Sequence, residues 1–351
     1  MITKIMKAKG QLPEDEEVMK EAKRIIDSGG LVAIPTETVY GLAGNALDPT
    51  SSKKIYAAKG RPSDNPLIVH IADTDDLSVI AQNIPDTAYK LAEKFWPGPL
   101  TMILSKTEAV PKETTGGLDT VAVRMPSDRI ASEFIKICGP FIAAPSANAS
   151  GRPSCTTAKH VVEDLNGKIE LVIDGGEVGI GLESTIVDLT GRIPCLLRPG
   201  FISREDLERI TGPIDVDPAV YNKNKPDTAP KAPGMKYRHY APEGELTVVD
   251  GPHESVIIYI NEKCGEASVS GKRCAVLATS ENLKAYSADM IFDMGSRENI
   301  NAVSHNLFSC LRKCDENGAD IIFSEAFEPE GLGEALMNRL LKASGNRVVK
   351  L

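Results

Sequence analysis

The chain of 351 residues lacks long hydrophobic runs, paired cysteine motifs and an excess of positive charge. No apolar stretch is long enough to cross a bilayer, and the N-terminal segment MITKIMKAKG has no signal-peptide core. We therefore expect a cytoplasmic protein without membrane contact. The seven cysteines include no C-x-x-C pair, which argues against a disulfide framework and against a structural zinc site. Cys310 and Cys314 share one face of a predicted helix, and core packing explains them best.

The low content of cations and aromatic residues restricts the range of partners. A net charge of −9 argues against a broad, non-specific grip on nucleic acid, although it leaves room for local basic clusters. Aromatic residues make up 5% of the chain, so few side chains could stack on bases. Trp96, the only tryptophan, is expected to be a packing residue.

Length and composition predict two domains joined by a linker. A hydrophobic content of 42% and a charged content of 25% are ordinary for a soluble globular protein of this size. Composition changes at Pro213, after which prolines recur and apolar periodicity is lost. We predict domains at 1–212 and 246–351, with a Pro-rich linker at 213–245. The linker contains APGMKYRHYAP, which we interpret as a ligand-contacting or lid segment, or else as a segment that packs on one domain.

We interpret the segment KGRPSDNPLIVH at 59–70 as the one around which the chain is organised, and it lies between a predicted helix and a short buried strand. Two prolines stiffen this loop, so Lys59, Arg61 and Asn65 would lose little entropy on binding a ligand. The two cations suit the phosphates of a nucleotide. A solvated basic turn would explain the same residues.

Polar side chains also follow the predicted strand at 31–34. Thr36, Glu37, Thr38 and Tyr40 come directly after it, in a turn that closes at a glycine. A simple turn needs fewer polar groups, which favours a functional role, although threonine also serves as a cap.

Two further predicted strands end in the same way. Arg124 ends the strand VAVR, and a buried guanidinium there requires a carboxylate from the protein or from a ligand. The strand FIAA leads into a loop that carries Ser146 and Asn148. If these strands are neighbours, their ends line one crevice, which could hold phosphates and a carboxylate together. The chemistry expected there is transfer at phosphorus, or activation of an acid by a nucleotide.

The alternation of predicted strands and helices in the C-terminal part predicts a small three-layer domain with a parallel sheet. Strands are expected at LTVVD, SVIIYI, CAVLA, MIFDM and DIIFS, and helices at 298–317 and 332–344. This part contains no G-x-G-x-x-G, P-loop or metal signature.

Seven segments in register, followed by the linker motif, resemble the long form of the threonylcarbamoyl-AMP synthase family. They are IPTETVYGL, KGRPSDNPLIVHI, PGPLT, VAVRMP, APSANASGRPS, STIVD and LLRPG, followed by APGMKYRHYAP. The resemblance covers the whole chain. It implies an α/β fold: a YrdC-like catalytic domain at 1–212 with a twisted, mostly parallel sheet, and a smaller Rossmann-like domain at 246–351.

The resemblance also implies a reaction and its partners. L-threonine, bicarbonate or CO2, and ATP would give threonylcarbamoyl-adenylate and pyrophosphate, with Mg2+ accompanying the ATP through ligands that the sequence does not identify. A separate transferase complex would place the threonylcarbamoyl group on adenosine 37 of tRNA, so direct tRNA contact is expected to be weak at most.

The resemblance assigns site residues position by position. Those that match the family's ATP or adenylate contacts are Lys59, Arg61, Asn65, Thr120, Ser146, Asn148, Ser154, Arg198 and, in the linker, Tyr240. Those that match its threonine pocket are Thr38, His70, Arg124, Ala144 and Ser184. Lys59 and Arg61 are the predicted catalytic residues, because they would offset charge on the phosphates. A core histidine is the alternative interpretation of His70, which its register with the family motif disfavours.

Two other functions remain as alternatives. One is carbamoyl transfer from carbamoyl phosphate, because hydrogenase-maturation carbamoyltransferases contain a similar domain, although they add zinc-finger cysteines and an acylphosphatase module that this chain lacks. The other is an RNA-binding module, which the acidic balance disfavours.

Overall fold

The computed structural model describes residues 2–221, 230–233 and 239–351, which divide into two compact units. The first unit comprises 1–150, 154–179 and 183–236, and the second comprises 151–153, 180–182 and 237–351. The last division lies inside the segment 213–245, and the predicted linker bounds stay a prediction. The expected lid role of APGMKYRHYAP falls partly on 234–238, outside the described residues.

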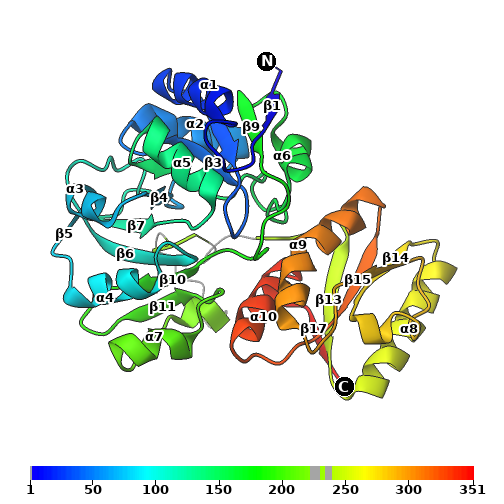
Figure 1. Ribbon diagram of the computed structural model, residues 1–351. Helices are drawn as coiled ribbons and strands as arrows, with labels where there is room; N and C mark the ends of the chain where they lie inside the picture. Colours follow the sequence, from blue (N-terminus) through cyan, green and yellow to red (C-terminus); the bar gives the residue numbers. More distant parts are fainter. Residues whose placement is uncertain (1, 222–229, 234–238) are drawn as a thin grey trace. The chain divides into compact units, whose positions relative to one another are not determined.

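The first unit holds one large sheet and seven α-helices within its described residues (Figure 1). Its strands are β1 (Lys4–Lys7), β2 (Val32–Ile34), β3 (Gly41–Asn45), β4 (Ile68–His70), β5 (Ala81–Gln82), β6 (Leu100–Lys106), β7 (Thr120–Arg124), β8 (Ile142–Ala143), β9 (Leu171–Asp174), β10 (Thr185–Asp188), β11 (Cys195–Arg198) and β12 (Asp215–Val216). Its helices are α1 (Glu16–Asp27), α2 (Pro49–Lys59), α3 (Leu77–Ile80), α4 (Asp86–Phe95), α5 (Arg129–Cys138), α6 (Ala158–Leu165) and α7 (Arg204–Thr211), with short 3-10 turns at Thr74–Asp76 and Pro218–Tyr221.

The α/β class is confirmed, but the first sheet is mixed rather than mostly parallel. Its strand order is β1-β9-β2-β3-β8-β4-β7-β6-β10-β11-β12, with β5 on β6. The sheet contains both parallel pairs, such as β4 with β7, and antiparallel pairs, such as β2 with β3. The loop between β2 and β3 is too short for the crossover that parallel neighbours need, so these strands turn back on each other.

Strand β3 was not expected, because its sequence GLAGN reads as part of a turn. Small residues are needed there because β3 is packed closely on its neighbours. A Cβ at Gly41 would lie 3.2 Å from the Cβ of Ala144, and one at Gly44 would lie 3.1 Å from Leu31 Cδ2. Close approach of neighbouring side chains therefore outweighs the low β-propensity of glycine here.

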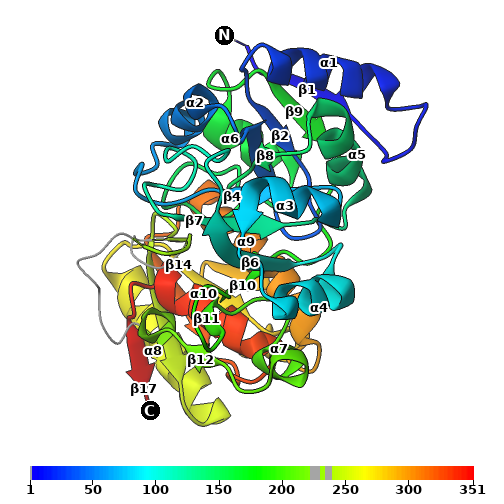
Figure 2. The same cartoon turned by 90° about the vertical axis from the view of Figure 1, so that its left-hand side faces the viewer.

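Helices cover both faces of this sheet, and the strands alternate accordingly. Along β2, Val32 and Ile34 join a hydrophobic cluster with side chains of α1 and α5, whereas Ala33 joins the cluster that includes side chains of α2, α4, α6 and α7. Figure 2 shows α1 and α5 side by side on one face. Burial on both faces leaves the strand ends as the places where polar side chains gather.

The second unit contains a five-stranded sheet that is parallel throughout. Its strands are β13 (Glu245–Asp250), β14 (Cys274–Ala278), β15 (Met290–Asp293), β16 (Ile321–Glu325) and β17 (Val348–Lys350), in the order β15-β14-β16-β13-β17. Its helices are α8 (His253–Val269), α9 (Ile300–Glu316) and α10 (Leu332–Ala343), with a 3-10 turn at Ser280–Asn282. In Figure 1, α8 lies on one face of the sheet, and α9 and α10 lie on the other. The predicted Rossmann-like architecture is confirmed.

The prediction of a strand at SVIIYI is wrong, because these residues lie in α8. The β-branched and aromatic run has a local preference for strands. However, β13 and β14 are parallel strands of one sheet, and their connection requires a crossover helix. Val256, Ile260, Cys264 and Ala267 are buried at helical spacing, while Ile258 is 67% exposed.

Cys310, Cys314 and Trp96 are all buried. Cys310 and Cys314 lie in α9, which fits core packing. Trp96 is buried and donates its indole N–H to Leu100 O at 2.7 Å. Among the described residues, no helix is both long and apolar enough to cross a membrane.

Candidate functional site

Strand register brings several predicted site residues to one edge of the first sheet. Arg124 ends β7 and pairs with His70 of β4 and with Thr101 of β6. Thr101 pairs in turn with Ile186 of β10, and Ile186 pairs with Arg198 of β11. The predicted threonine pocket and one predicted ATP contact therefore share this edge.

Arg124 is 4% exposed, and its Nε, Nη1 and Nη2 each contact one protein group. Its Nη1 donates to Thr38 Oγ1 at 2.9 Å, and its Nε donates to Gly98 O at 3.3 Å. Its Nη2 lies 2.7 Å from Glu37 Oε1. The sequence left open whether this guanidinium meets a protein or a ligand carboxylate, and the structure gives it a protein carboxylate.

Glu37 belongs to the polar group predicted after the strand at 31–34, but it is absent from the residues assigned to a ligand. Burial alone would raise the pKa of Glu37, but the charge of Arg124 and its hydrogen bond outweigh burial and hold that pKa below its ordinary value. Glu37 is therefore ionised at neutral pH, and the pair is a buried ion pair. The sequence signal was the need of Arg124 for a carboxylate, but nothing in the sequence linked it to Glu37.

His70 lies beside Arg124 and is 2% exposed. Its Nδ1 is 3.3 Å from Ile68 O. Burial, followed by the positive charge of Arg124, lowers the pKa of His70 to about 3. The imidazole is therefore neutral and can orient a ligand without adding charge.

Ser184 and Arg198 touch each other, although the predictions assign them to different ligands. Arg198 donates from Nη2 to Ser184 Oγ at 3.1 Å and from Nε to Ser184 O at 3.0 Å. Ser184 Oγ is also 2.7 Å from Thr101 Oγ1. All three side chains are at most 4% exposed. A ligand that binds one of these three side chains would therefore also change the contacts of the other two.

Lys59 ends α2 and reaches the loop that carries two predicted ATP contacts. Its Nζ donates to Ser146 O, and to Asn148 O at 2.5 Å. Ser146 is bridged to Gly41, the first residue of β3. Lys59 is buried, and its two carbonyl contacts fix this loop.

The rest of the basic loop is held by main-chain carbonyls. Arg61 donates from Nε to Asn65 O at 3.2 Å and from Nη2 to Pro66 O at 2.9 Å. Tyr56 donates to Asn65 O at 3.1 Å. The side-chain Oδ1 of Asn65 is buried, and no described residue donates to it. A solvated basic turn does not fit these contacts, because Lys59, Arg61 and Asn65 are all buried.

The other predicted residues belong to the first unit, apart from one. Ser154 donates to Glu183 Oε1 at 2.5 Å, which adds a second carboxylate that the predictions missed. Ala144 is buried and donates its N–H to Ile68 O at 3.0 Å, and Thr120 begins β7. Tyr240 belongs to the second unit.

Tyr240 is buried within the second unit. Its ring centroid lies 5.2 Å from that of Phe308, and the guanidinium carbon of Arg339 lies 5.8 Å from its ring centroid. Its φ of 63° is in the left-handed region. Its expected contact with ATP stays a prediction.

Metal binding by the chain itself has no candidate in the described residues. They contain no group of three or more His, Cys, Asp or Glu side chains that could hold a metal ion. The cations and hydroxyls of the first unit suit anionic groups instead.

Comparison with known proteins places the whole chain in one family. A family model described as "Telomere recombination" matches residues 24–200, and one described as "Threonylcarbamoyl-AMP synthase, C-terminal domain" matches residues 202–345. A Pyrococcus abyssi (strain GE5 / Orsay) protein named threonylcarbamoyl-AMP synthase is 52% identical over 96% of this chain and 97% of its own length. A Bacillus subtilis (strain 168) protein of the same name is 45% identical over 97% of this chain and 96% of its own length.

A solved structure agrees with these matches. The crystal structure of P. abyssi Sua5 complexed with L-threonine has a TM-score of 0.94 and 50% identity, covering 99% of this chain and 100% of that one. The resemblance drawn from the motifs is thereby confirmed for both halves of the chain. The chain belongs to the threonylcarbamoyl-AMP synthase family, in the long form that carries both domains.

Proposed function

We propose that this chain converts L-threonine, CO2 or bicarbonate, and ATP into threonylcarbamoyl-AMP and pyrophosphate. It is thus a nucleotidyltransferase whose product serves tRNA threonylcarbamoyladenosine formation, through a separate transferase complex. The observation that carries the proposal is the 52% identity, over nearly the full length of both chains, to a protein named for this reaction. The buried groups along one sheet edge support it.

The reaction would proceed in two balanced steps. The amine of L-threonine attacks CO2, which forms a carbamate and releases a proton. A carbamate oxygen then attacks the α-phosphorus of ATP, and the bond from that phosphorus to the bridging oxygen breaks, so that pyrophosphate leaves with the electron pair. Within 2–221, 230–233 and 239–351 we identify no general base, and the first step does not require one.

We assign the binding of threonine to the group around Arg124. The threonine carboxylate would take a bidentate position on its guanidinium, which now pairs with Glu37. Thr38, Ser184 and neutral His70 offer hydrogen-bonding groups around it, and Ala144 leaves room beside the main chain.

We assign the triphosphate to Lys59 and Arg61, with Asn65, Thr120, Ser146, Asn148, Ser154, Arg198 and Tyr240 as further contacts. The two cations offset charge on the phosphates and on the departing pyrophosphate. ATP would enter as its Mg2+ complex, so the metal is part of the substrate.

Purified protein supplied with ATP, bicarbonate and L-threonine tests the proposal. We expect pyrophosphate release and threonylcarbamoyl-AMP by chromatography, both dependent on threonine. Arg61→Ala should lower turnover by at least about a hundredfold. Arg192→Ala, an exposed arginine of the same unit, should leave turnover unchanged. Product from carbamoyl phosphate without threonine, or near-normal turnover by Arg61→Ala, would contradict the proposal. So would tight, salt-sensitive tRNA binding without nucleotide turnover.

A further inference from the structure

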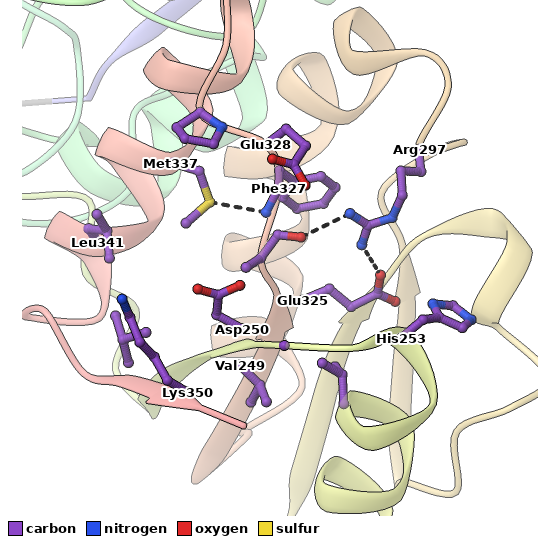
Figure 3. A pocket seen from close by; sticks show the side chains of 15 residues that line it. Val249, Asp250, His253, Arg297, Glu325, Phe327, Glu328, Met337, Leu341 and Lys350 are labelled. Carbon is purple, nitrogen blue, oxygen red and sulfur yellow. Dashed lines mark hydrogen bonds and ion pairs between the residues drawn. The ribbon is translucent and has the colours of Figure 1, made fainter.

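The second unit has a cavity that the proposed reaction does not use. Figure 3 shows it at the carboxyl ends of three strands, and its volume is about 610 Å3. Asp250 ends β13, Glu325 ends β16 and Lys350 ends β17, and all three line it. Cavities of about 300–1,000 Å3 are typical of small-molecule sites.

The position of this cavity follows from the topology of the sheet. β13 and β16 are neighbours, but the chain leaves them in opposite directions, through α8 to β14 and through α10 to β17. Both crossover connections are expected to be right-handed, and they run in opposite directions along the sheet. Their helices therefore lie on opposite faces of the sheet, as Figure 1 shows. The loops after β13 and β16 therefore separate. Open parallel sheets bind ligands in the crevice at such a point.

Some charged side chains in the wall of this cavity are exposed and have no partner within the described part of the chain. Asp250, Glu328 and Lys350 line the cavity, and no described residue forms a side-chain hydrogen bond or ion pair with them. The same holds for His253, the first residue of α8, whose N-cap residue provides no side-chain cap. Both signs of charge are thus available to a ligand.

Arg297 is fixed on the opposite side of the cavity from Lys350 (Figure 3). Its Nη1 donates to Ala326 O at 3.0 Å, its Nη2 donates to buried Glu325, and its guanidinium carbon lies 4.9 Å from the ring centroid of Phe327. A guanidinium has five N–H donors, so others remain for a ligand anion. Its side chain is 41% exposed, which leaves it accessible.

The remaining wall is apolar. It is formed by Val249, Val256, Phe327, Met337, Leu341 and Val348. A ligand that fits must therefore carry charged groups of both signs and a small apolar part.

The charge balance decides the class of ligand. Three carboxylates, those of Asp250, Glu325 and Glu328, line the cavity with two cations, those of Arg297 and Lys350. A nucleotide polyphosphate would add several negative charges to a wall that already has an excess of acids. The loop after β13 also lacks the glycine-rich turn that holds a pyrophosphate. A zwitterion adds no net charge and uses both signs.

We propose that this cavity is a second small-molecule site, separate from the reaction site, and that it binds a free amino acid. The α-carboxylate lies at Arg297 and the N-terminus of α8, where helix N–H groups and the guanidinium favour an anion. The α-ammonium lies at Asp250. The side chain of the ligand contacts Met337 and its apolar neighbours.

Methyl NMR on the full-length chain tests this proposal, because Met337 lines the cavity. Protein labelled with carbon-13 at its methionine methyl groups is titrated with each of the common amino acids, and Met337→Leu assigns the resonance. We expect at least one amino acid to shift the Met337 resonance saturably. Met294, buried elsewhere in the same unit, serves as the internal control and should not move.

Two variants locate the binding groups. Asp250→Asn removes the charge that holds the ammonium, and it should weaken the Met337 response by about tenfold or more. Lys284→Gln, which changes an exposed lysine outside the cavity, should leave the response unchanged. The other methionine signals report in each case whether the variant is folded.

Three results would overturn the proposal. They are no Met337 shift from any amino acid up to about 10 mM, a shift that Asp250→Asn leaves unchanged, and a shift produced by ATP or AMP but by no amino acid. Met125, next to Arg124, reports separately on the proposed threonine pocket. If the Met125 resonance shows no response, the Met337 resonance still tests the second site. If the Met337 resonance shows no response, the Met125 resonance still tests the threonine pocket.

Discussion

Replacing Glu37 by glutamine should destabilise the first unit strongly, because it removes the only carboxylate that the described residues place against Arg124. The two side chains are 13% and 5% exposed, and their charged atoms are 2.7 Å apart. Breaking a buried ion pair by changing one partner costs about 3–5 kcal/mol, because the other charge stays buried. The glutamine amide still offers an oxygen to Arg124, so we expect the lower end, about 3 kcal/mol.

Thermal denaturation gives the measurement. For a unit of this size, about 3 kcal/mol corresponds to a decrease in Tm of roughly 6–12 °C. Glu113→Gln is the matched control, because it breaks the exposed pair with Lys53, in which the side chains are 38% and 67% exposed. The control should leave Tm nearly unchanged.

L-threonine provides a second readout of the same variant. Its carboxylate would give Arg124 a new partner, so saturating L-threonine should raise the Tm of Glu37→Gln by more than it raises that of the wild type. A Tm for Glu37→Gln no lower than that of Glu113→Gln would refute the reasoning. An equal threonine effect in wild type and variant would refute the assignment of the carboxylate to Arg124.

Three further predictions concern the same sheet edge. His70 has a pKa of about 3 in the folded state and an ordinary pKa of about 6.5 in the unfolded state, so its contribution to stability is present above pH 6.5 and is lost as the pH falls toward 3. In urea titrations between these pH values, the free energy of unfolding of His70→Gln should fall by about 1.4 kcal/mol less per pH unit than that of the wild type. Equal slopes for the two proteins would argue against a buried neutral imidazole. Ser184→Ala removes the hydroxyl that accepts from Arg198 Nη2 but keeps the main-chain oxygen that accepts from Nε, and it should raise the KM for L-threonine by about tenfold in the pyrophosphate assay, whereas an unchanged KM would exclude Ser184 from the pocket. Gly200→Ala would place a Cβ 2.4 Å from Thr185 N and should lower Tm by several degrees, whereas Gly191→Ala, whose Cβ would be 3.4 Å from Ile193 O, should not; similar values for both would show that the chain yields at Gly200.

Several elements could be predicted because their signals are local. Acidic residues in the first turn and an amphipathic stripe predict α1, and Gly60 predicts the end of α2. Arg124 was expected at a strand end with a carboxylate partner for a reason that needs no structure: a buried guanidinium must be paired. These inferences depend only on residues near each other in the chain.

What could not be predicted depends on residues far apart. The carboxylate beside Arg124 comes from Glu37, and the carboxylate beside Ser154 comes from Glu183. The sheet is mixed because β3 and β8 lie between β2 and β4, an order that hydrophobic patterns do not reveal. The apolar run SVIIYI is a helix only because β13 and β14 are parallel. In each case tertiary packing overrides or completes the local signal.

The buried Oδ1 of Asn65, to which no described residue donates, bears on how tightly a ligand could be held. An unsatisfied acceptor of this kind costs the fold about 1–3 kcal/mol. A bound molecule that presents an N–H or O–H group to this oxygen recovers that loss on top of its own new contact. The ligand-free protein therefore carries a free-energy cost that the bound protein does not, and the removal of this cost adds to the affinity for the ligand.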